Sequence, residues 1–326
     1  MATSGTLGTT TVDTGKLIEH AVRRCGLPAQ TITAEVAEIA RDNLFLILLN
    51  LSNRGINLWC VDEKLIATVA GQSRYLMPAG TIDILNLLYS TPTLATGTDA
   101  TTATTYTTTL TADSDVVRYA FTLPSAVASS TFYFESSPDG ATWTTVDTQA
   151  ATSWAAGTYW YKLTTTPNET YYRVRCSISA TISAISLAAS VSDLPMSALN
   201  RDEYANQTNK ATQSLTSTNY YFEKLVDPQF AAWPVPSVST NHFTLYRHRQ
   251  IQDVGTLMQS IELPMRWMES IIWQLAARLS FEIPSVAPDR LAAVQQMAER
   301  YLLDAEGNET DHAPVYFAPR IGVYTR

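Results

Sequence analysis

The sequence contains few charged side chains, and basic ones are the rarer kind. Only 16% of its 326 residues are charged, and the formal net charge is −8. Proteins that bind nucleic acid or anionic membranes use clustered lysine and arginine to neutralise phosphates. The composition therefore argues against DNA as a direct ligand.

Cysteine is also scarce. Cys25, Cys60 and Cys176 are the three cysteines, and no two of them are close in sequence. This spacing indicates neither a disulfide framework nor a zinc site, so we expect a reducing place of synthesis. Apolar runs of the roughly 20 residues that span a bilayer are missing, and so are the basic start and apolar core of a signal peptide. We expect the protein to be made and assembled inside a cell.

Catalytic signatures are missing too. The sequence has no GxSxG, no HExxH and no phosphate-binding glycine loop. Polar structural roles are our expectation for its four histidines, His20, His242, His248 and His312. The stretch from Asp304 resembles a calcium loop but has no glycine at its sixth position and no glutamate at its twelfth. We therefore expect no enzyme activity, no cofactor and no metal.

One small basic group stands in strand-like sequence. Arg247 and Arg249 alternate with His248, so in a strand the two arginines share one face. Two arginines are too few for nucleic acid. We expect them to pair with carboxylates across a sheet or a subunit boundary.

Helical periodicity is present near both ends of the chain. Residues 15–55 predict two helices, the first ending at Gly26 and the second capped by Thr33. Pro264 and Pro288 each suit the first turn of a later helix. The helix after Pro264 carries an apolar stripe, whose central residues we interpret as core: Trp267, Ile271 and Leu275. Trp273, also in this helix, is interpreted as a packing residue and not as a stacking platform for a ligand.

The sequence changes character at Tyr89. A candidate strand, TIDILNLLYS, is followed by a tract dominated by threonine, which favours extended backbone over helix. Further on, FYFESSPDGATWTTV predicts a hairpin that turns at Pro138 and Gly140. Alternation resumes in TYWYKLTTTPNETYYRVRCSIS. We interpret residues 92–192 as a small antiparallel β-sandwich inserted into the chain.

The segments on either side of this insert are expected to form one discontinuous domain, residues 1–91 and 193–326. It would contain the N-terminal helix pair, a small antiparallel sheet, the C-terminal helix pair and an extended tail. The expected fold class is thus α+β: a helical-bundle core with a small antiparallel sheet, interrupted by an all-β sandwich domain.

The tail, APVYFAPRIGVYTR, is rich in aromatic and aliphatic side chains, and its prolines prevent helix formation. Terminal segments seldom carry such side chains unless something holds them. The tail could fold back on its own sheet, or it could reach a neighbour and add a strand to an exposed edge. We favour the second alternative, with these residues as the docking candidates: Val315, Tyr316, Phe317, Arg320, Ile321 and Tyr324.

The outer segments resemble the head-to-tail adaptors of short-tailed bacteriophages, also called connectors or tubular tail protein A. The resemblance covers about two thirds of the chain and is carried by the order of GKLIEHAVRRCGLPA, SRYLMPAGTIDIL, DPQFAAWPVP and LPMRWMESIIWQLAARLSFEI. The insert departs from the family pattern, and FYFESSPDGATWTTV is similar to hairpins of immunoglobulin-like and carbohydrate-binding sandwiches.

This resemblance implies a structural virion protein with a helical-bundle adaptor core. Its subunits would form a homo-oligomeric, dodecameric ring at the head–tail junction, between the portal protein and the tail tube or nozzle protein. DNA would pass through the lumen without specific binding during genome ejection, and assembly would take place in the host bacterial cytoplasm.

Two other functions stay open beside this adaptor. One is a glycan-binding or adhesin-type protein, in which the sandwich is the working part and the helices are a base. The other is a carbohydrate-active enzyme, which needs two carboxylates facing each other across a cleft. No acidic pair in the sequence is marked out for that role.

Overall fold

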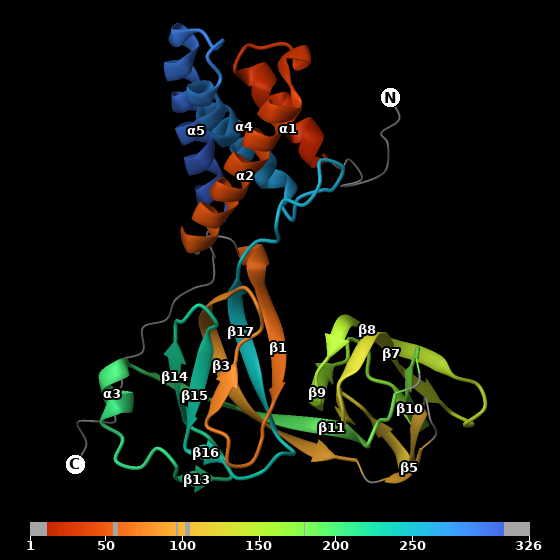
Figure 1. Ribbon diagram of the computed structural model, residues 1–326. Helices are drawn as coiled ribbons and strands as arrows, with labels where there is room; N and C mark the ends of the chain where they lie inside the picture. The colour runs from red at the N-terminus through yellow and green to blue at the C-terminus, as the bar shows by residue number, and fades with distance from the viewer. Residues whose placement is uncertain (1–11, 55–57, 96, 102–104, 179, 310–326) are drawn as a thin grey trace. The chain divides into compact units, whose positions relative to one another are not determined.

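The computed structural model describes residues 12–54, 58–95, 97–101, 105–178 and 180–309 (Figure 1). The chain divides into two compact units. The helical unit joins both ends of the chain, Met1–Cys60 and Gln250–Arg326, and the β unit is the middle, Val61–Arg249.

In its described residues, the helical unit contains four long helices at the places that the periodicity predicts. They are α1 (Thr14–Arg24), α2 (Ala34–Arg54), α4 (Met265–Glu282) and α5 (Pro288–Gly307), with short 3₁₀ turns at Ala29–Thr31 and Leu58–Cys60. Asp13 caps α1 by accepting a hydrogen bond of 2.7 Å from the backbone N–H of Lys16. After α1, Gly26 takes the positive φ of 85° that favours glycine, which ends the helix there.

The core of the helical unit is built around α4. Trp267, Ile271 and Leu275 are completely buried and belong to one apolar cluster with residues of α1, α2 and α5. The Trp267 ring packs on Trp59 with 5.4 Å between ring centroids. Its Nε1 donates a hydrogen bond of 3.0 Å to the buried carboxylate of Glu309. The buried indole N–H of Trp267 therefore has a partner.

The described part of the β unit contains three larger sheets and a short ladder. The six-stranded sheet has the order β1, β17, β3, β11, β6, β9, with bounds Val61–Ala67, His242–Arg249, Thr81–Leu94, Ala184–Pro195, Arg118–Leu123 and Gly157–Lys162. The five-stranded sheet has the order β4, β5, β10, β7, β8, with bounds Gly97–Thr101, Thr105–Asp115, Asn168–Cys176, Val127–Ser137 and Thr144–Trp154.

The four-stranded sheet has the order β12, β14, β15, β2, with bounds Ser197–Leu199, Asn219–Glu223, Gln229–Trp233 and Arg74–Leu76. A two-stranded ladder pairs β13 (Gln213–Ser214) with β16 (Val235–Pro236), and a short helix, α3 (Arg201–Ala205), follows β12.

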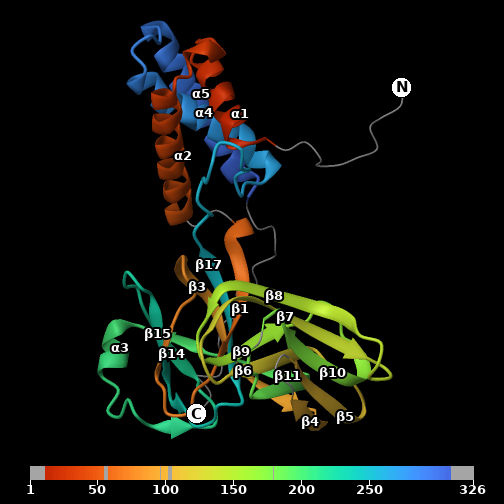
Figure 2. The same cartoon turned by 45° about the vertical axis from the view of Figure 1, so that its right-hand side comes forward.

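The six-stranded sheet takes part in two separate apolar cores. Strands β6, β9 and β11 pack on the five-stranded sheet (Figure 2). Between them Phe121 stacks on Phe132 and Tyr119 on Phe134, with centroid distances of 4.7 and 4.0 Å. Strands β3 and β17 pack on the four-stranded sheet through the ring of Phe243. The long six-stranded sheet therefore links two sandwich-like layers.

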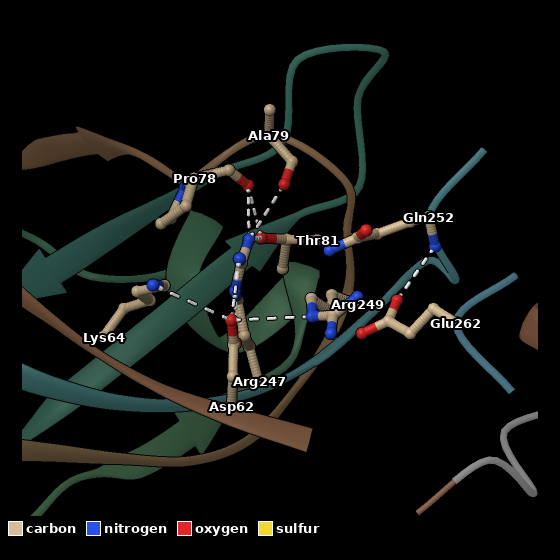
Figure 3. A network of polar contacts seen from close by, with 9 residues as sticks. All are labelled: Asp62, Lys64, Pro78, Ala79, Thr81, Arg247, Arg249, Gln252 and Glu262. Atoms are coloured by element: carbon tan, nitrogen blue, oxygen red, sulfur yellow. Dashed lines mark hydrogen bonds and ion pairs between the residues drawn. The ribbon is translucent and has the colours of Figure 1, made fainter. Parts of the chain in front are cut away.

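A buried arginine fastens β1 to β17 (Figure 3). Two guanidinium nitrogens of Arg247 lie 2.7 and 3.1 Å from the two oxygens of Asp62, and the third donates to the carbonyls of Pro78 and Ala79 at 2.8 and 3.0 Å. Arg249 lies 3.7 Å from Asp62 as well. The expectation that these arginines pair with a carboxylate across a sheet is confirmed.

The expected fold class is wrong. Strands hold more of the described residues than helices do, and the helices group in a unit of their own instead of forming one core with a small sheet. Strands from both sides of the supposed insert, β1, β3 and β17, share one sheet with β6, β9 and β11. The reason lies in β3, which runs from Thr81 to Leu94 and so continues through the composition change at Tyr89. The isoleucines before Tyr89 and the threonines after it are both β-branched, and such residues favour extended backbone.

The proposed insert boundaries, 92 and 192, therefore fall inside β3 and β11, where Thr91 pairs with Ser192. The capacity of residues 92–192 to fold alone stays a prediction.

Candidate ligand-binding groove

A groove of about 1150 Å³ lies in the β unit where three strand edges meet, and we call it the seam groove. Strands β1 and β9 are the two outermost strands of the six-stranded sheet, and β8 is outermost in the five-stranded sheet. The six-stranded sheet coils strongly enough to bring β1 and β9 close together. The groove follows this seam and is lined by residues 63–69 of β1 and its following turn and by residues 157–164 of β9 and its following turn.

An ion pair crosses the seam. The ammonium of Lys162 in β9 lies 2.8 Å from Oε2 of Glu63 in β1. The other oxygen of Glu63 lies 4.0 Å from the guanidinium of Arg118, a buried residue of β6. The carboxylate of Glu63 is thus balanced by two cations, which leaves this part of the groove without excess negative charge.

Backbone groups contribute to the lining. Consecutive residues of β1 and β9 line the groove, as happens when a strand presents its edge and not one face. Among the described strand ladders, β1 pairs only with β17 and β9 only with β6. About half of the N–H and C=O groups of an edge strand point away from its partner. Such groups can hydrogen-bond a ligand in the groove.

The lining side chains combine aromatic rings with uncharged polar groups. The aromatic ones are Tyr75, Trp154, Tyr159, Trp160 and Tyr161, and the amides and hydroxyls include Gln72, Gln149, Ser153, Thr158 and Ser239. Burial raises the pKa of Tyr159 and of Tyr161 above the ordinary value for tyrosine. Both phenols therefore keep their protons at any ordinary pH.

Trp160 is a deeply buried lining residue with an unsatisfied hydrogen-bond donor. The side chain is 4% exposed, and its Nε1 has no hydrogen-bond partner among the described residues. A buried N–H without a partner costs free energy.

A buried polar cluster packs against the ring of Trp160. Its ring stacks on the imidazole of His242, with 4.5 Å between centroids. Arg118 donates hydrogen bonds to Nε2 of His242 at 2.6 Å and to the hydroxyl of Thr244 at 3.0 Å. Burial, aided by the Arg118 charge, lowers the pKa of His242 to about 3, so the ring stays neutral and can accept.

Asp193 and Ser90 complete this cluster. Arg118 lies 3.3 Å from one oxygen of Asp193, and the Ser90 hydroxyl donates to the other at 2.5 Å. The cluster joins β3, β6, β11 and β17, which are distant in sequence. The position of Trp160 in the groove wall is therefore set by a network that only the folded β unit can form.

The residues singled out from the sequence lie elsewhere. The tail residues Val315, Tyr316, Phe317, Arg320, Ile321 and Tyr324 lie outside the described residues. Trp267, Ile271 and Leu275 belong to the helical unit, and none of them lines the seam groove. The sequence marked TYWYK only as a strand, because the partners that turn it into a groove wall come from residues 63–75 and 149–154.

The described part of the chain has neither a cluster of metal ligands nor a membrane-spanning helix. Nowhere in it do three or more histidine, cysteine, aspartate or glutamate side chains gather in a way that could hold a metal ion. None of the described helices has the length and apolar character needed to cross a membrane.

Comparisons with known proteins give matches of fold only at low similarity. No family model matches the chain, and no curated protein matches it. One matching solved structure is "CpGH89CBM32-6 produced by Clostridium perfringens", with 12% identity and a TM-score of 0.24 over 39% of this chain and 94% of that chain. Another is CBM32-3 from a family 31 glycoside hydrolase of the same organism, with 18% identity and a TM-score of 0.20 over 40% of this chain and 91% of that one.

CBM32-1 from a family 31 glycoside hydrolase of Clostridium perfringens matches similarly, with 10% identity and a TM-score of 0.23 over 39% and 94% of the two chains. These neighbours are of the kind that the hairpin sequence FYFESSPDGATWTTV is similar to, and none of the three is a phage adaptor. TM-scores this low carry no argument about function.

Proposed function

We propose that the chain is a glycan-binding protein and that the seam groove takes an uncharged oligosaccharide. The observation that carries this proposal is the lining itself, which joins aromatic rings, amides, hydroxyls and strand-edge backbone groups in one open groove. Sugar rings have an apolar C–H face that packs on aromatic rings and hydroxyls that both donate and accept hydrogen bonds.

Charge and size support an uncharged and extended ligand. Glu63 is balanced by Lys162 and Arg118, so the groove offers no unpaired acidic or basic cluster at its centre. Its volume of about 1150 Å³ exceeds the roughly 300–1,000 Å³ of sites for drug-sized molecules. A ligand of several sugar units fits this volume better than a single ring.

The test is a glycan array followed by calorimetric titration of the best glycan. Ser153 of β8 is exposed and lines the groove, so Ser153→Trp should obstruct it and weaken binding at least tenfold. Thr152 is the neighbouring exposed residue and does not line the groove, so Thr152→Trp is the matched control and should bind as the natural chain does.

Two results would overturn the proposal. One is an array without any glycan above background. The other is a glycan whose binding both variants leave unchanged, since the site would then lie elsewhere. Capture of an extended peptide by the groove, lost in Ser153→Trp, would assign it to strand addition instead of glycan binding.

A second function is favoured by the surface of the helical unit. Large apolar side chains are exposed on α2, α4 and α5: Phe45, Leu46, Met265, Phe281 and Leu303. Contiguous exposed apolar groups mark surfaces that another chain covers, and Phe45 and Leu46 are adjacent on α2. We propose on this ground that copies of the chain associate through the helical unit, in the ring-forming, portal-binding role that the sequence resemblance implies.

Light scattering and electron microscopy of the purified chain test this second function. A ring that Leu46→Asp breaks into monomers is the expected result. A monomer at all concentrations, with or without a portal protein, would contradict it.

A further inference from the structure

A second cavity in the β unit gathers positive charge. It has a volume of about 800 Å³ and lies among α3, β2 and β14. Four cationic side chains line it, Arg74, Arg201, Lys210 and Lys224, against a single carboxylate, Glu223. Such a concentration is unusual in a chain whose net charge is −8.

Two of these cations are already balanced. Arg74 lies 3.1 and 3.2 Å from the two oxygens of Glu223. Lys224 lies 3.1 Å from a carboxylate oxygen of Asp83.

The other two cations have no carboxylate partner among the described residues. The ammonium of Lys210 donates only to backbone carbonyls, those of Ala205 at 2.9 Å and Gln207 at 3.5 Å. Arg201 is exposed and makes no ion pair with any described side chain. The cavity therefore has an excess of two positive charges for an incoming anion.

A pair of stacked tyrosines lies beside these charges. Tyr204 and Tyr221 are 5.0 Å apart between ring centroids, with 16° between ring planes. Tyr204 is buried and Tyr221 half-buried, so the accessible part of Tyr221 lines the cavity and is backed by the Tyr204 ring. The ammonium of Lys210 lies 5.5 Å from the Tyr204 ring centroid, so the cation and the aromatic surface are neighbours.

The backbone fixes the elements that carry the cavity. Helix α3 begins with a capping box in which Asn200 and Glu203 satisfy each other's backbone N–H groups at 2.8 and 2.9 Å. Strand β12 pairs Leu199 with Tyr221 of β14. Arg201 follows Leu199 by two residues, so its backbone is held close to Tyr221. Less conformational entropy is therefore lost when Arg201 and Tyr221 contact one ligand.

We infer that this cavity binds a small anion that carries a ring. Arg201 and Lys210 would hold a carboxylate or phosphate group by charge-assisted hydrogen bonds, and the Tyr221 surface would receive the ring. A uronic acid and a sugar phosphate share this chemistry. The site is separate from the seam groove and does not depend on the proposed function.

Calorimetric titration of the full chain at low salt tests the site. The probes are glucuronate, glucose 6-phosphate, inorganic phosphate and glucose. We expect at least one of the two charged sugars to bind at least tenfold more tightly than glucose, and more tightly than inorganic phosphate. Whichever of glucuronate and glucose 6-phosphate binds more tightly shows whether the site prefers a carboxylate or a phosphate group.

Variants give the matched comparison. Arg201→Gln and Lys210→Gln should each weaken binding about tenfold, and Arg300→Gln, which removes an exposed cation of α5, should leave it unchanged. Circular dichroism checks that the variants are folded. Equal binding of glucose and the charged sugars, equal binding of inorganic phosphate and the charged sugars, equal loss in Arg300→Gln, or absence of binding by any probe would each overturn the inference.

Discussion

At the scale of single residues, Arg118 connects more of the β unit than any local pattern suggests. It is 6% exposed and contacts His242 and Thr244 of β17 and Asp193 of β11. A buried cation is stable only when its hydrogen bonds are satisfied. Arg118 was not recognisable in the sequence as a buried residue, because its hydrogen-bond partners lie between 75 and 126 positions away.

Arg118→Met keeps the apolar stem and removes the hydrogen bonds to His242, Thr244 and Asp193. We expect the free energy of unfolding of the β unit to fall by about 2–3 kcal/mol, because hydrogen bonds to charged groups are among the stronger ones. Urea unfolding measures it, with Arg300→Met as the exposed control. A loss below about 0.5 kcal/mol, typical of surface substitutions, would contradict the role.

His242 gives a prediction about pH. Its pKa in the folded protein is about 3, below the ordinary value of 6.5, because it is buried beside Arg118. Between these two values the unfolded chain binds a proton that the folded chain does not, so stability is lost as pH falls through this range. The slope for one such group is up to about 1.4 kcal/mol per pH unit.

The measurement is urea unfolding at several pH values, compared with His242→Gln. We expect the variant to lose less stability than the natural chain between pH 6.5 and 4.5, since acidic groups contribute equally to both. Parallel pH curves for the two proteins would show that His242 does not titrate on unfolding in this way.

At the scale of elements, the helices were predictable and the sheets were not. Helical spacing, Pro264, Pro288 and Gly26 place the four long helices, because these signals act within one or two turns. The hairpin at Pro138 is also local, and its strands are β7 and β8. Sheet order depends on pairings such as β3 with β17 and β6 with β11, and no local signal encodes them.

The same limit applies to the seam groove. TYWYK was recognisable as an aromatic-rich strand, but the wall opposite it comes from β1, roughly a hundred positions earlier in the chain. The basic cavity is similar, since Arg74 and Lys210 come from distant segments. The sequence therefore predicts strands and candidate side chains, and the coiling of the sheet brings them together.

A prediction for the helices concerns the middle of α4. Trp267→Ala removes a completely buried ring that packs on Trp59 and donates to Glu309. We expect a loss of about 3–5 kcal/mol in the stability of the helical unit, the usual cost of deleting a large buried aromatic side chain. Phe281→Ala on the same helix is the control, because Phe281 is 65% exposed. Melting curves decide it, and a loss below about 1 kcal/mol for Trp267→Ala would contradict its place in the core.

At the scale of the whole molecule, the chain forms two units whose cores are separate. The helical unit takes both ends and the β unit takes the middle, so the backbone passes between them near Cys60 and again near Arg249. Domain boundaries of this kind allow each unit to keep its own core. The division differs from one at 92 and 192, which would cut through β3 and β11.

The separate cores lead to a prediction about deletion. The change removes residues 92–192 and joins Thr91 to Asp193 by a short Gly/Ser linker, which leaves the whole helical unit intact. A short linker suffices because Thr91 pairs with Ser192, the neighbour of Asp193, in the full chain. We expect the remaining chain to keep its α-helix content by circular dichroism, while the seam groove is lost with β8 and β9. A deletion product without helix would show that the helical unit needs the removed segment.

The central claim is that the seam groove of the β unit is a glycan-binding site. Hydrogen–deuterium exchange of the full chain, with and without the best glycan of the array, tests it most directly, because it reports where backbone amides become protected. The account predicts slower exchange in peptides that cover residues 63–69 and 157–164, with no change in α1, α2, α4 or α5. Protection elsewhere in the chain, with these two segments unchanged at saturating glycan, would contradict it.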